Sequence, residues 1–270
     1  MNRFHIIANQ NKDPEGTFTE QVRSFLEARG RRCTLGASVP EDTECVITLG
    51  GDGTLLRAAR NFVHMNVAFL GINIGHLGYL TEGDRESAEE VLEKVVRDEY
   101  VLEERIMLSG RILRDGEEVY RDAALNDVTL NRFRTPNMIN FALNVNGQPL
   151  YKYKADGIIV ATPTGSTAYN LSCGGPIVEP TAKLFVVTPI APHSLNDRSL
   201  ILSGMDRIEI ELLESDRLEE QAEYTVYFDG DTSVIIYPGD KLEIEKAEQV
   251  AKIMRLSRRS FLETLRSKMS

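Results

Sequence analysis

The chain has 270 residues, of which 42% are hydrophobic and 27% are charged, an ordinary composition for a globular protein with room for two domains. Its formal net charge of −10 argues against nucleic acid as a partner, because that binding depends on a basic surface. The N-terminus lacks the apolar stretch of a signal peptide, and no run approaches the roughly 20 apolar residues that cross a bilayer, so we expect no membrane partner.

The first hundred residues alternate strand-like and helix-like patterns. Apolar runs at residues 4–8, 45–49 and 67–70 predict buried strands. Thr17 with Glu20, and Ser87 with Glu90, have the spacing of capping boxes that start helices, and a third helix is predicted over residues 54–65. Strands that take turns with helices predict a Rossmann-like α/β domain over residues 1–100, with a parallel sheet covered on both faces.

The pattern changes at about residue 101. Three pairs, Asp115-Gly116, Asn146-Gly147 and Asp229-Gly230, are hairpin signals. Residues 208–212 and 242–245 alternate apolar and acidic side chains, as half-solvated antiparallel strands do. We therefore predict an all-β domain over residues 101–250, an antiparallel β-sandwich without a long helix. The fold class is α/β plus all-β, and the absence of a Pro/Ser linker predicts close packing of the two domains.

The last twenty residues, 251–270, are basic. Six Lys and Arg residues against Glu263 give this tail a charge of about +5 and leave about −15 for the rest. Such a tail could bind a membrane or nucleic acid, but Ile253, Leu256, Leu262 and Leu265 recur at roughly helical spacing. We favour a helix that packs back on the N-terminal domain.

An acid–glycine loop, Gly50-Gly51-Asp52-Gly53-Thr54, lies where a predicted buried strand turns into a helix. Such a position offers free backbone N–H groups and the positive end of a helix dipole, and glycines let phosphates approach the backbone. A carboxylate repels phosphate, so Asp52 fits this phosphate loop only if it accepts a proton or holds a metal. The structural alternative is a strand–helix turn in which Asp52 is the N-cap.

The loop is neither a Walker A motif nor a Gly-x-Gly-x-x-Gly fingerprint. It resembles the Gly-Gly-Asp-Gly signature that NAD kinases share with diacylglycerol-type lipid kinases and phosphofructokinases. The resemblance implies a kinase that acts on a hydroxyl group and does not choose among these families.

A second motif, residues 156–172, reads Asp-Gly-Ile-Ile-Val-Ala-Thr-Pro-Thr-Gly-Ser-Thr-Ala-Tyr-Asn-Leu-Ser. It predicts a strand at residues 158–161 followed by a loop that exposes hydroxyls, with Tyr169 as a flat face on which a base could stack. Residues 174–176, Gly-Gly-Pro, then form a tight turn. The chemistry alone also fits an ordinary loop rich in turn formers.

The second motif resembles the NAD-binding signature of the NAD kinase family. Further segments resemble that family in the right order, at residues 71–80, at Asn126-Asp127 and at His193-Ser194-Leu195. The resemblance extends from about residue 44 to residue 240. It implies transfer of the γ-phosphoryl group of ATP to the 2′-hydroxyl of the adenosine ribose of NAD, with Asp52 as the proton acceptor; polyphosphate is left open as an alternative donor.

The same resemblance implies the remaining roles. Gly53 and its neighbours would line the phosphates, Asn126 and Asp127 would hold ribose hydroxyls or the diphosphate, and Lys154 and Asp156 would contact the nicotinamide end or a neighbouring subunit's ligand. The NAD-binding residues implied in full are Asp52, Gly53, Arg57, Tyr79, Asn126, Asp127, Lys154, Asp156, Thr167, Ala168, Tyr169, Asn170, Leu171, Ser172 and Ala191.

The net charge of −10 opposes two anionic substrates, so the attraction must be local. Arg57, one turn into the helix after the loop, is one expected cation, and its alternative is a surface arginine. A divalent cation, Mg²⁺, is the other, with its ligands unknown. His76 and His193 are interpreted as structural. Asp231 stands where the family more often has Gln, which leaves its contact uncertain.

Two rival functions have their own expectations. A lipid kinase would need a lipid-accommodating apolar surface, which nothing in the second motif suggests. A catalytically silent NADP(H) sensor would have no need of the repulsive Asp52. The family resemblance also implies a homodimer or homotetramer. The three cysteines show no metal-ligand spacing and are expected to be reduced thiols in a cytoplasmic protein.

Overall fold

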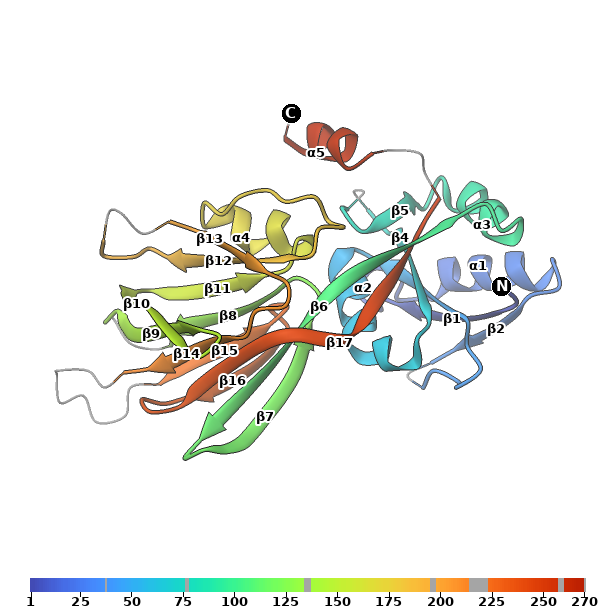
Figure 1. The fold of residues 1–270 in the computed structure, drawn as a ribbon. Coiled ribbons are helices and arrows are strands. Elements are labelled where there is room, and N and C mark those ends of the chain that lie inside the picture. The colour runs from blue at the N-terminus through green and yellow to red at the C-terminus, as the bar shows by residue number, and fades with distance from the viewer. Residues whose placement is uncertain are drawn as a thin grey trace. The chain divides into compact units, whose positions relative to one another are not determined.

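The computed structural model describes residues 1–36, 38–75, 78–133, 137–194, 198–213, 223–256 and 260–269. The chain divides into two compact units (Figure 1). The first unit is Met1–Arg105 together with Gln249–Ser270, and the second is Ile106–Glu248. The chain passes from one unit to the other inside two long strands, β6 (Val101–Arg114) and β17 (Lys241–Arg255).

The first unit is a parallel sheet with helices between its strands. Its strands pair in the order β2-β1-β3-β4, and both β5 and the end of β17 add to β4. The elements in chain order are β1 (Arg3–Ala8), α1 (Thr17–Glu27), β2 (Arg32–Leu35), β3 (Cys45–Gly50), α2 (Asp52–Phe62), the 3₁₀ helix η1 (Val63–Met65), β4 (Ala68–Asn73), β5 (Thr81–Asp84) and α3 (Ala88–Val96).

Helices cover both faces of this sheet, as predicted. Buried side chains of α1 and α3 share one hydrophobic cluster with Leu70 and Ile72 of β4. Successive residues of a strand point to opposite faces, so Gly71 faces the other side. A Cβ at Gly71 would lie 2.9 Å from Leu55 Cδ1, which places α2 on that second face.

The predicted strands of this unit are all present, but the capping predictions are wrong. Helix α1 begins at Thr17 with no side-chain cap from Thr17; instead the Asp13 carboxylate accepts the N–H groups of Phe18 and Thr19 at 3.2 and 2.9 Å. The Ser87 hydroxyl likewise donates to Asp84 Oδ1 at 2.7 Å and caps nothing. At α1 a carboxylate four residues before Thr17 accepts N–H groups of the first turn, and at α3 the Ser87 hydroxyl is bonded to Asp84 in place of a helical N–H.

The prediction for the basic tail is wrong in its first half. Ile253 is fully buried in β17 and pairs with Phe69 of β4 in parallel register. Burial beside β4 therefore overrides the helical spacing. A helix does follow, α5 (Phe261–Met269), in which the Lys268 Nζ lies 5.9 Å from the centre of the Tyr79 ring. None of the described helices is long and apolar enough to span a membrane.

The second unit is a β-sandwich. One antiparallel sheet has the strand order β13-β12-β11-β8-β15-β16. The sheet that faces it has the strand order β10-β9-β14-β17, and the hairpin β6-β7 pairs with β17. Its elements are β7 (Glu117–Ala124), β8 (Asp127–Arg132), β9 (Ile139–Val145), β10 (Gln148–Ala155), β11 (Gly157–Ala161), η2 (Thr164–Thr167), α4 (Tyr169–Ser172), β12 (Leu184–Ile190), β13 (Leu200–Ser203), β14 (Ile208–Leu212), β15 (Tyr224–Phe228) and β16 (Thr232–Ile236).

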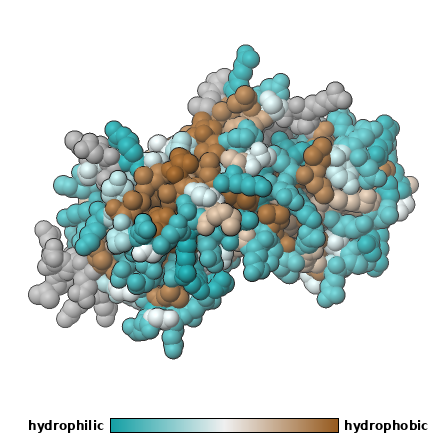
Figure 2. All heavy atoms as spheres, viewed as in Figure 1, coloured by the Kyte–Doolittle hydropathy of each residue, from teal (hydrophilic) through white to brown (hydrophobic). Residues whose placement is uncertain are grey.

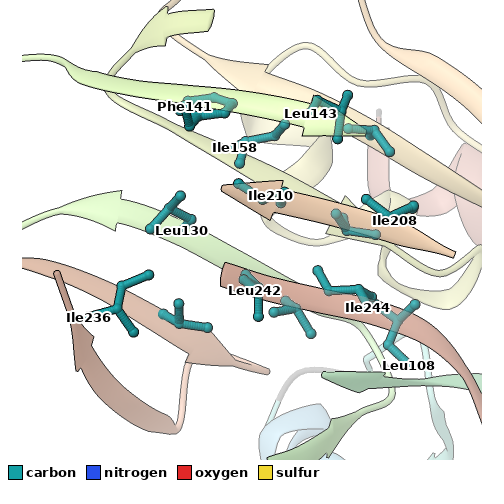
Figure 3. Packing of buried hydrophobic residues seen from close by; sticks show 14 of the residues in the cluster. Leu108, Leu130, Phe141, Leu143, Ile158, Ile208, Ile210, Ile236, Leu242 and Ile244 are labelled. Carbon is teal, nitrogen blue, oxygen red and sulfur yellow. The ribbon is translucent and has the colours of Figure 1, made fainter. Parts of the chain in front are cut away.

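The inner faces of the two sheets enclose one hydrophobic core (Figure 3). Phe141 and Leu143 of β9 and Ile210 of β14 point toward Ile158 of β11 and Leu130 of β8, and all five are buried. The three hairpin signals are confirmed, since both residues of each pair have positive φ, for example 53° and 67° at Asp229-Gly230.

One strand departs from the predicted half-solvated pattern. Glu243 of β17 is buried, with its side chain 9% exposed, and forms ion pairs with Arg111 and Arg207. Glu243 lies on the polar face, as the alternating pattern predicted, but the guanidinium groups of Arg111 and Arg207 cover it. The pattern did not indicate that burial.

Candidate functional site

The acid–glycine loop joins β3 to α2, as the sequence predicted. Gly50 is the last residue of β3, and Asp52 is the first residue of α2. The backbone N–H of Thr54 donates to the Gly51 carbonyl at 2.9 Å, which closes the first turn. The loop thereby presents the N-terminal end of α2, where the helix dipole is positive.

The Asp52 carboxylate is held by the loop that follows β4. The backbone N–H groups of Tyr79 and Leu80 donate to its two oxygens at 2.8 and 3.1 Å. A Cβ at Gly78 would lie 1.9 Å from Asp52 Oδ1, so only glycine permits this approach. Tyr79 therefore adjoins Asp52, and burial, followed by the Asp52 charge, raises the pKa of its phenol.

Lys12 is a cation at this loop that sequence reasoning missed. Its Nζ lies 3.5 Å from the position of a Cβ at Gly51 and 4.0 Å from that at Gly75. The signal that could have found it is a lysine four residues beyond a buried strand, since the loops after neighbouring parallel strands meet at one edge of the sheet.

A cavity of about 480 Å³ lies between the end of β1 and α2. Arg57, predicted as an NAD contact, lies here with Thr54 of the phosphate loop. The described lining contains no carboxylate, and the residues are Ile7, Ala8, Asn9, Gln10, Asn11, Gly36, Thr54, Arg57, Ala58, Asn61 and Phe62. We refer to it below as the β1–α2 cavity.

In the second unit the loop of the second motif is bonded to the segment before β8. The Thr162 hydroxyl donates to the Leu125 carbonyl at 2.6 Å, and the Thr162 N–H donates to the Asn126 carbonyl at 2.8 Å. A Cβ at Gly165 would lie 2.1 Å from that Asn126 oxygen. Glycine at this position lets η2 pack directly against the Asn126 backbone.

Asp229 fixes the same segment from the other side. Its carboxylate accepts the backbone N–H groups of Leu125, Asn126 and Asp127 at 3.0, 2.7 and 3.3 Å. Sequence reasoning placed Asp229 in a hairpin turn and missed this contact. More than a hundred residues separate the partners, so no local pattern indicates it.

These contacts border a cavity of about 330 Å³, the Asp127 cavity, which brings four of the predicted NAD contacts together: Asn126, Asp127, Ala168 and Tyr169. Tyr169 is 43% exposed and presents its ring. The further lining residues are Thr129, Asn131, Tyr227, Asp229 and Gly230, and the described lining contains no Lys or Arg.

Asp127 is 5% exposed and lies beside the second carboxylate, Asp229. Burial, and then the charge of Asp229, raise the pKa of the Asp127 carboxyl to about 7, although the Thr129 hydroxyl donates to it at 3.1 Å. At neutral pH this carboxyl is partly protonated, so it can donate a hydrogen bond as well as accept one.

Other predicted contacts lie outside the lining of either cavity. The Asn170 side chain is fully buried, donating to the Ser166 and Pro176 carbonyls and accepting from the Thr188 hydroxyl at 2.7 Å. Asp156 pairs with Arg132 at 3.2 Å. Lys154, Thr167, Leu171, Ser172 and Ala191 also belong to the second unit, whereas Asp52, Gly53 and Tyr79 belong to the first.

Of the two histidines in the segments that resemble the family, His193 is described by the structure and His76 is not. The backbone N–H of His193 donates to the Lys154 carbonyl at 2.9 Å. His76 lies outside the described residues. Over the described part of the chain, no group of three or more His, Cys, Asp or Glu side chains gathers as metal ligands would.

Comparison with known proteins identifies what this chain is similar to. Residues 31–100 match the family model of the ATP-NAD kinase N-terminal domain, and residues 125–256 match that of the ATP-NAD kinase C-terminal domain. The chain is 43% identical to the NAD kinase of Lachnospira eligens, with 100% of both chains covered, and 38% identical to that of Lachnoclostridium phytofermentans, with 99% of each covered.

Two solved structures resemble the fold. The yeast NADH kinase complexed with NADH has a TM-score of 0.84 at 22% identity, covering 100% of this chain and 87% of that one, a likeness of fold alone. The Archaeoglobus fulgidus NAD kinase in complex with ATP has a TM-score of 0.77 at 27% identity, covering 98% of each chain.

Proposed function

The chain belongs to the NAD kinase family and phosphorylates NAD with ATP, and we propose that Asp52 accepts the proton of the attacking hydroxyl. The acceptor is the 2′-hydroxyl of the adenosine ribose, and the group transferred is the γ-phosphoryl group of ATP. The observation that carries this assignment is a carboxylate held in place at the N-terminal end of α2, a position that otherwise favours phosphate.

A ribose hydroxyl is a weak nucleophile at neutral pH, so a placed base and proximity supply most of the rate. The N–H groups of Tyr79 and Leu80 fix the direction of the Asp52 carboxylate. As the hydroxyl oxygen attacks the γ-phosphorus, its proton passes to Asp52 and the bond to the bridging oxygen of ADP breaks. The helix end and Gly53 then face the phosphate oxygens.

The Asp127 cavity supports a site for the uncharged parts of NAD. Tyr169 offers an exposed ring for the adenine beside Ala168, and Asn126 and Asp127 offer hydrogen bonds to ribose hydroxyls. Thr167, Leu171 and Ser172, in the same short helical segments, are proposed as further contacts of the adenine end. Lys154, Asp156 and Ala191 would contact the nicotinamide end or a neighbouring subunit's ligand. Asn170 would act by holding the loop, since its amide is already bonded inside it.

We further infer that a divalent cation, Mg²⁺, accompanies the phosphates of ATP to this loop; those phosphates would hold it, because Asp52 is assigned to the proton transfer. When bound it would offset phosphate charge. The chain's own contribution is the helix end and the carboxylate.

The test is Asp52→Asn, which keeps the size of the side chain and removes the base; its amide can accept only one of the two backbone N–H bonds that hold the carboxylate. With MgATP and NAD, we expect NADP formation to fall by roughly a hundredfold or more while NAD binding changes little. Asp42→Asn is the matched control, since Asp42 pairs with Arg3 and Arg32 at the surface. An Asp52→Asn variant that turns over at the wild-type rate would disprove the assignment. Product from diacylglycerol but none from NAD would instead favour a lipid kinase.

We further infer a cytoplasmic homo-oligomer, a dimer or tetramer. Cys33, Cys45 and Cys173 are free thiols, which suits a reducing compartment. Hydrophobic residues gather on the face of the second unit around α4 and β13 in Figure 2, and Ile201 and Met205 are 53% and 80% exposed. Light scattering during size-exclusion chromatography tests this, and a monomer at micromolar concentration would contradict it.

A further inference from the structure

A buried glutamate, Glu82, follows directly after the loop that holds Asp52. Its side chain is 1% exposed, and it lies in β5, two residues beyond Leu80. The register of β5 on β4 shifts between Thr81 and Gly83, so Glu82 is the extra residue of a β-bulge. Bulges redirect a side chain and interrupt the ladder of backbone bonds. The position of the Glu82 carboxylate therefore depends on its side-chain contacts.

The end of β17 supplies those contacts. Arg255 Nη1 lies 2.8 Å from Glu82 Oε1, and the backbone N–H of Leu256 donates to Glu82 Oε2 at 2.7 Å. Strand β3 pairs with the whole of β4, so β17 and β5 follow one another along the opposite edge of β4. Strand β17 pairs there with Ala68 and Phe69, at the start of β4, and β5 pairs with its end. Arg255, the last residue of β17, thus arrives where β5 begins.

Arg255 also lies beside a second acid, Glu103 of β6. Its Nε is 3.5 Å from Glu103 Oε2, and the same oxygen accepts a hydrogen bond from Arg105 Nη2 at 2.7 Å. The side chain of Arg105 is 4% exposed. Two carboxylates and two guanidinium groups thus form one cluster whose formal charges cancel. A buried ion pair adds little stability over an apolar pair of the same volume, so we interpret the cluster as fixing the direction of Glu82.

The loop between β4 and β5 links this cluster to Asp52. The N–H of Gly78 donates to Thr81 Oγ1 at 2.9 Å, which ties the loop to the first residue of β5. The N–H groups of Tyr79 and Leu80, inside the loop, hold the Asp52 carboxylate. A shift of β5 would therefore move both N–H groups relative to Asp52. A misplacement of about 1 Å in a reacting group can cost roughly a hundredfold in rate.

We propose that Arg255 is a positioning residue for the kinase reaction. By pairing with Glu82 it fixes β5, and β5 fixes the N–H groups that aim the Asp52 carboxylate at the attacking hydroxyl. This inference rests on the proposed function and adds to it a residue from the far end of the chain. Because Arg255 acts through Asp52 and not on a substrate, its loss should change kcat more than either KM.

The first test is Arg255→Met, which removes the cation and keeps an unbranched side chain. With MgATP and NAD, we expect kcat to fall by roughly tenfold to a hundredfold, while both KM values stay within about twofold of wild type. Arg255→Lys keeps the charge and should recover part of kcat. Arg114→Met is the matched control, since Arg114 pairs with the buried Asp240 in the second unit at 2.7 Å, and its kcat should equal that of wild type.

A double variant separates positioning from stability. Glu82→Leu combined with Arg255→Met replaces the ion pair by apolar side chains. It should restore the urea midpoint that Arg255→Met alone lowers, because an apolar pair can match a buried ion pair in stability. We expect kcat to stay low, since apolar side chains do not fix the direction of β5. A double variant that recovers both the midpoint and kcat would overturn the inference.

A mutant cycle with Asp52→Asn tests the route of the effect. Arg255→Met should lower kcat in the wild-type background and add no further loss to Asp52→Asn, because the two changes act on one group. Equal losses in both backgrounds would contradict the inference, as would a wild-type kcat in folded Arg255→Met beside an inactive Asp52→Asn. A wild-type rate in Asp52→Asn alone would instead refute the proposed function.

Discussion

The two cavities differ in the charge of their described linings. The β1–α2 cavity has amides, Arg57 and the nearby Lys12, whereas the Asp127 cavity has the carboxylates of Asp127 and Asp229 and no cation. The proposed function uses this difference in charge. The phosphates of the substrates would lie near the cations and the helix end of the first unit, and the ribose hydroxyls and the adenine would lie beside the acids of the second.

The largest effect that would test this division is expected at Gly78. A Cβ there would lie 1.9 Å from Asp52 Oδ1, so Gly78→Ala must displace the carboxylate or the loop that holds it. We expect kcat to fall by roughly a hundredfold, by loss of the placed base. Binding of a non-hydrolysable ATP analogue should be largely kept, since the change removes neither Lys12 nor Arg57, the cations near which the phosphates would lie. Steady-state kinetics with calorimetry would measure both, and a wild-type kcat would contradict the role given to the loop.

A smaller effect is expected from Asp229→Ala in the second unit. The change leaves three backbone N–H groups, those of Leu125, Asn126 and Asp127, without their carboxylate. We expect the free energy of unfolding to fall by about 2–4 kcal/mol and NAD binding to weaken, with ATP-analogue binding kept. Urea denaturation measures the first. Asp229→Asn keeps one acceptor oxygen and should lose less; equal losses in both variants would show that charge, not the acceptor, is what matters.

The smallest effect is a pH dependence that belongs to the second unit alone. The pKa of Asp127 is raised from 3.8 to about 7, so the folded protein holds this proton more tightly than the unfolded chain. The resulting stability is fully present below about pH 4 and is lost as the pH rises to about 7.

Asp127→Asn removes that titration. The difference in unfolding free energy between variant and wild type should therefore shift in favour of the variant between pH 5 and pH 8, by an amount on the order of a few kcal/mol. Urea midpoints at the two pH values give the measurement, and Asp42→Asn at the surface of the first unit is the control. Parallel pH profiles for Asp127→Asn and wild type would refute the raised pKa.

Local sequence was enough to predict the features that depend on local chemistry. The turn from β3 to Asp52 and the hairpins at Asp115, Asn146 and Asp229 follow from residues that stand next to one another. The family resemblance supplied Asp127 and Tyr169, which the fold brings to one cavity.

The parts that could not be predicted depend on contacts between distant segments. Asp229 bonds to a segment about a hundred residues earlier, and Lys12 meets Gly51 only because β1 and β3 are adjacent strands. Ile253 has helical spacing to Leu256, yet it forms part of strand β17, because it pairs with Phe69 at the edge of β4. In each case the deciding partner lies outside any window along the chain.

The passage of the chain through β6 and β17 has a consequence for how the protein is made. Residues Met1–Arg105 leave the ribosome first, but the strand that pairs with Ala68 and Phe69 of β4 is translated only after the whole of Ile106–Glu248. During translation, the sheet that carries the phosphate loop therefore lacks its β17 strand at β4 until almost the whole chain has been synthesised. The sheet of the first unit is therefore completed only after the second unit, which holds Asp127, has been synthesised.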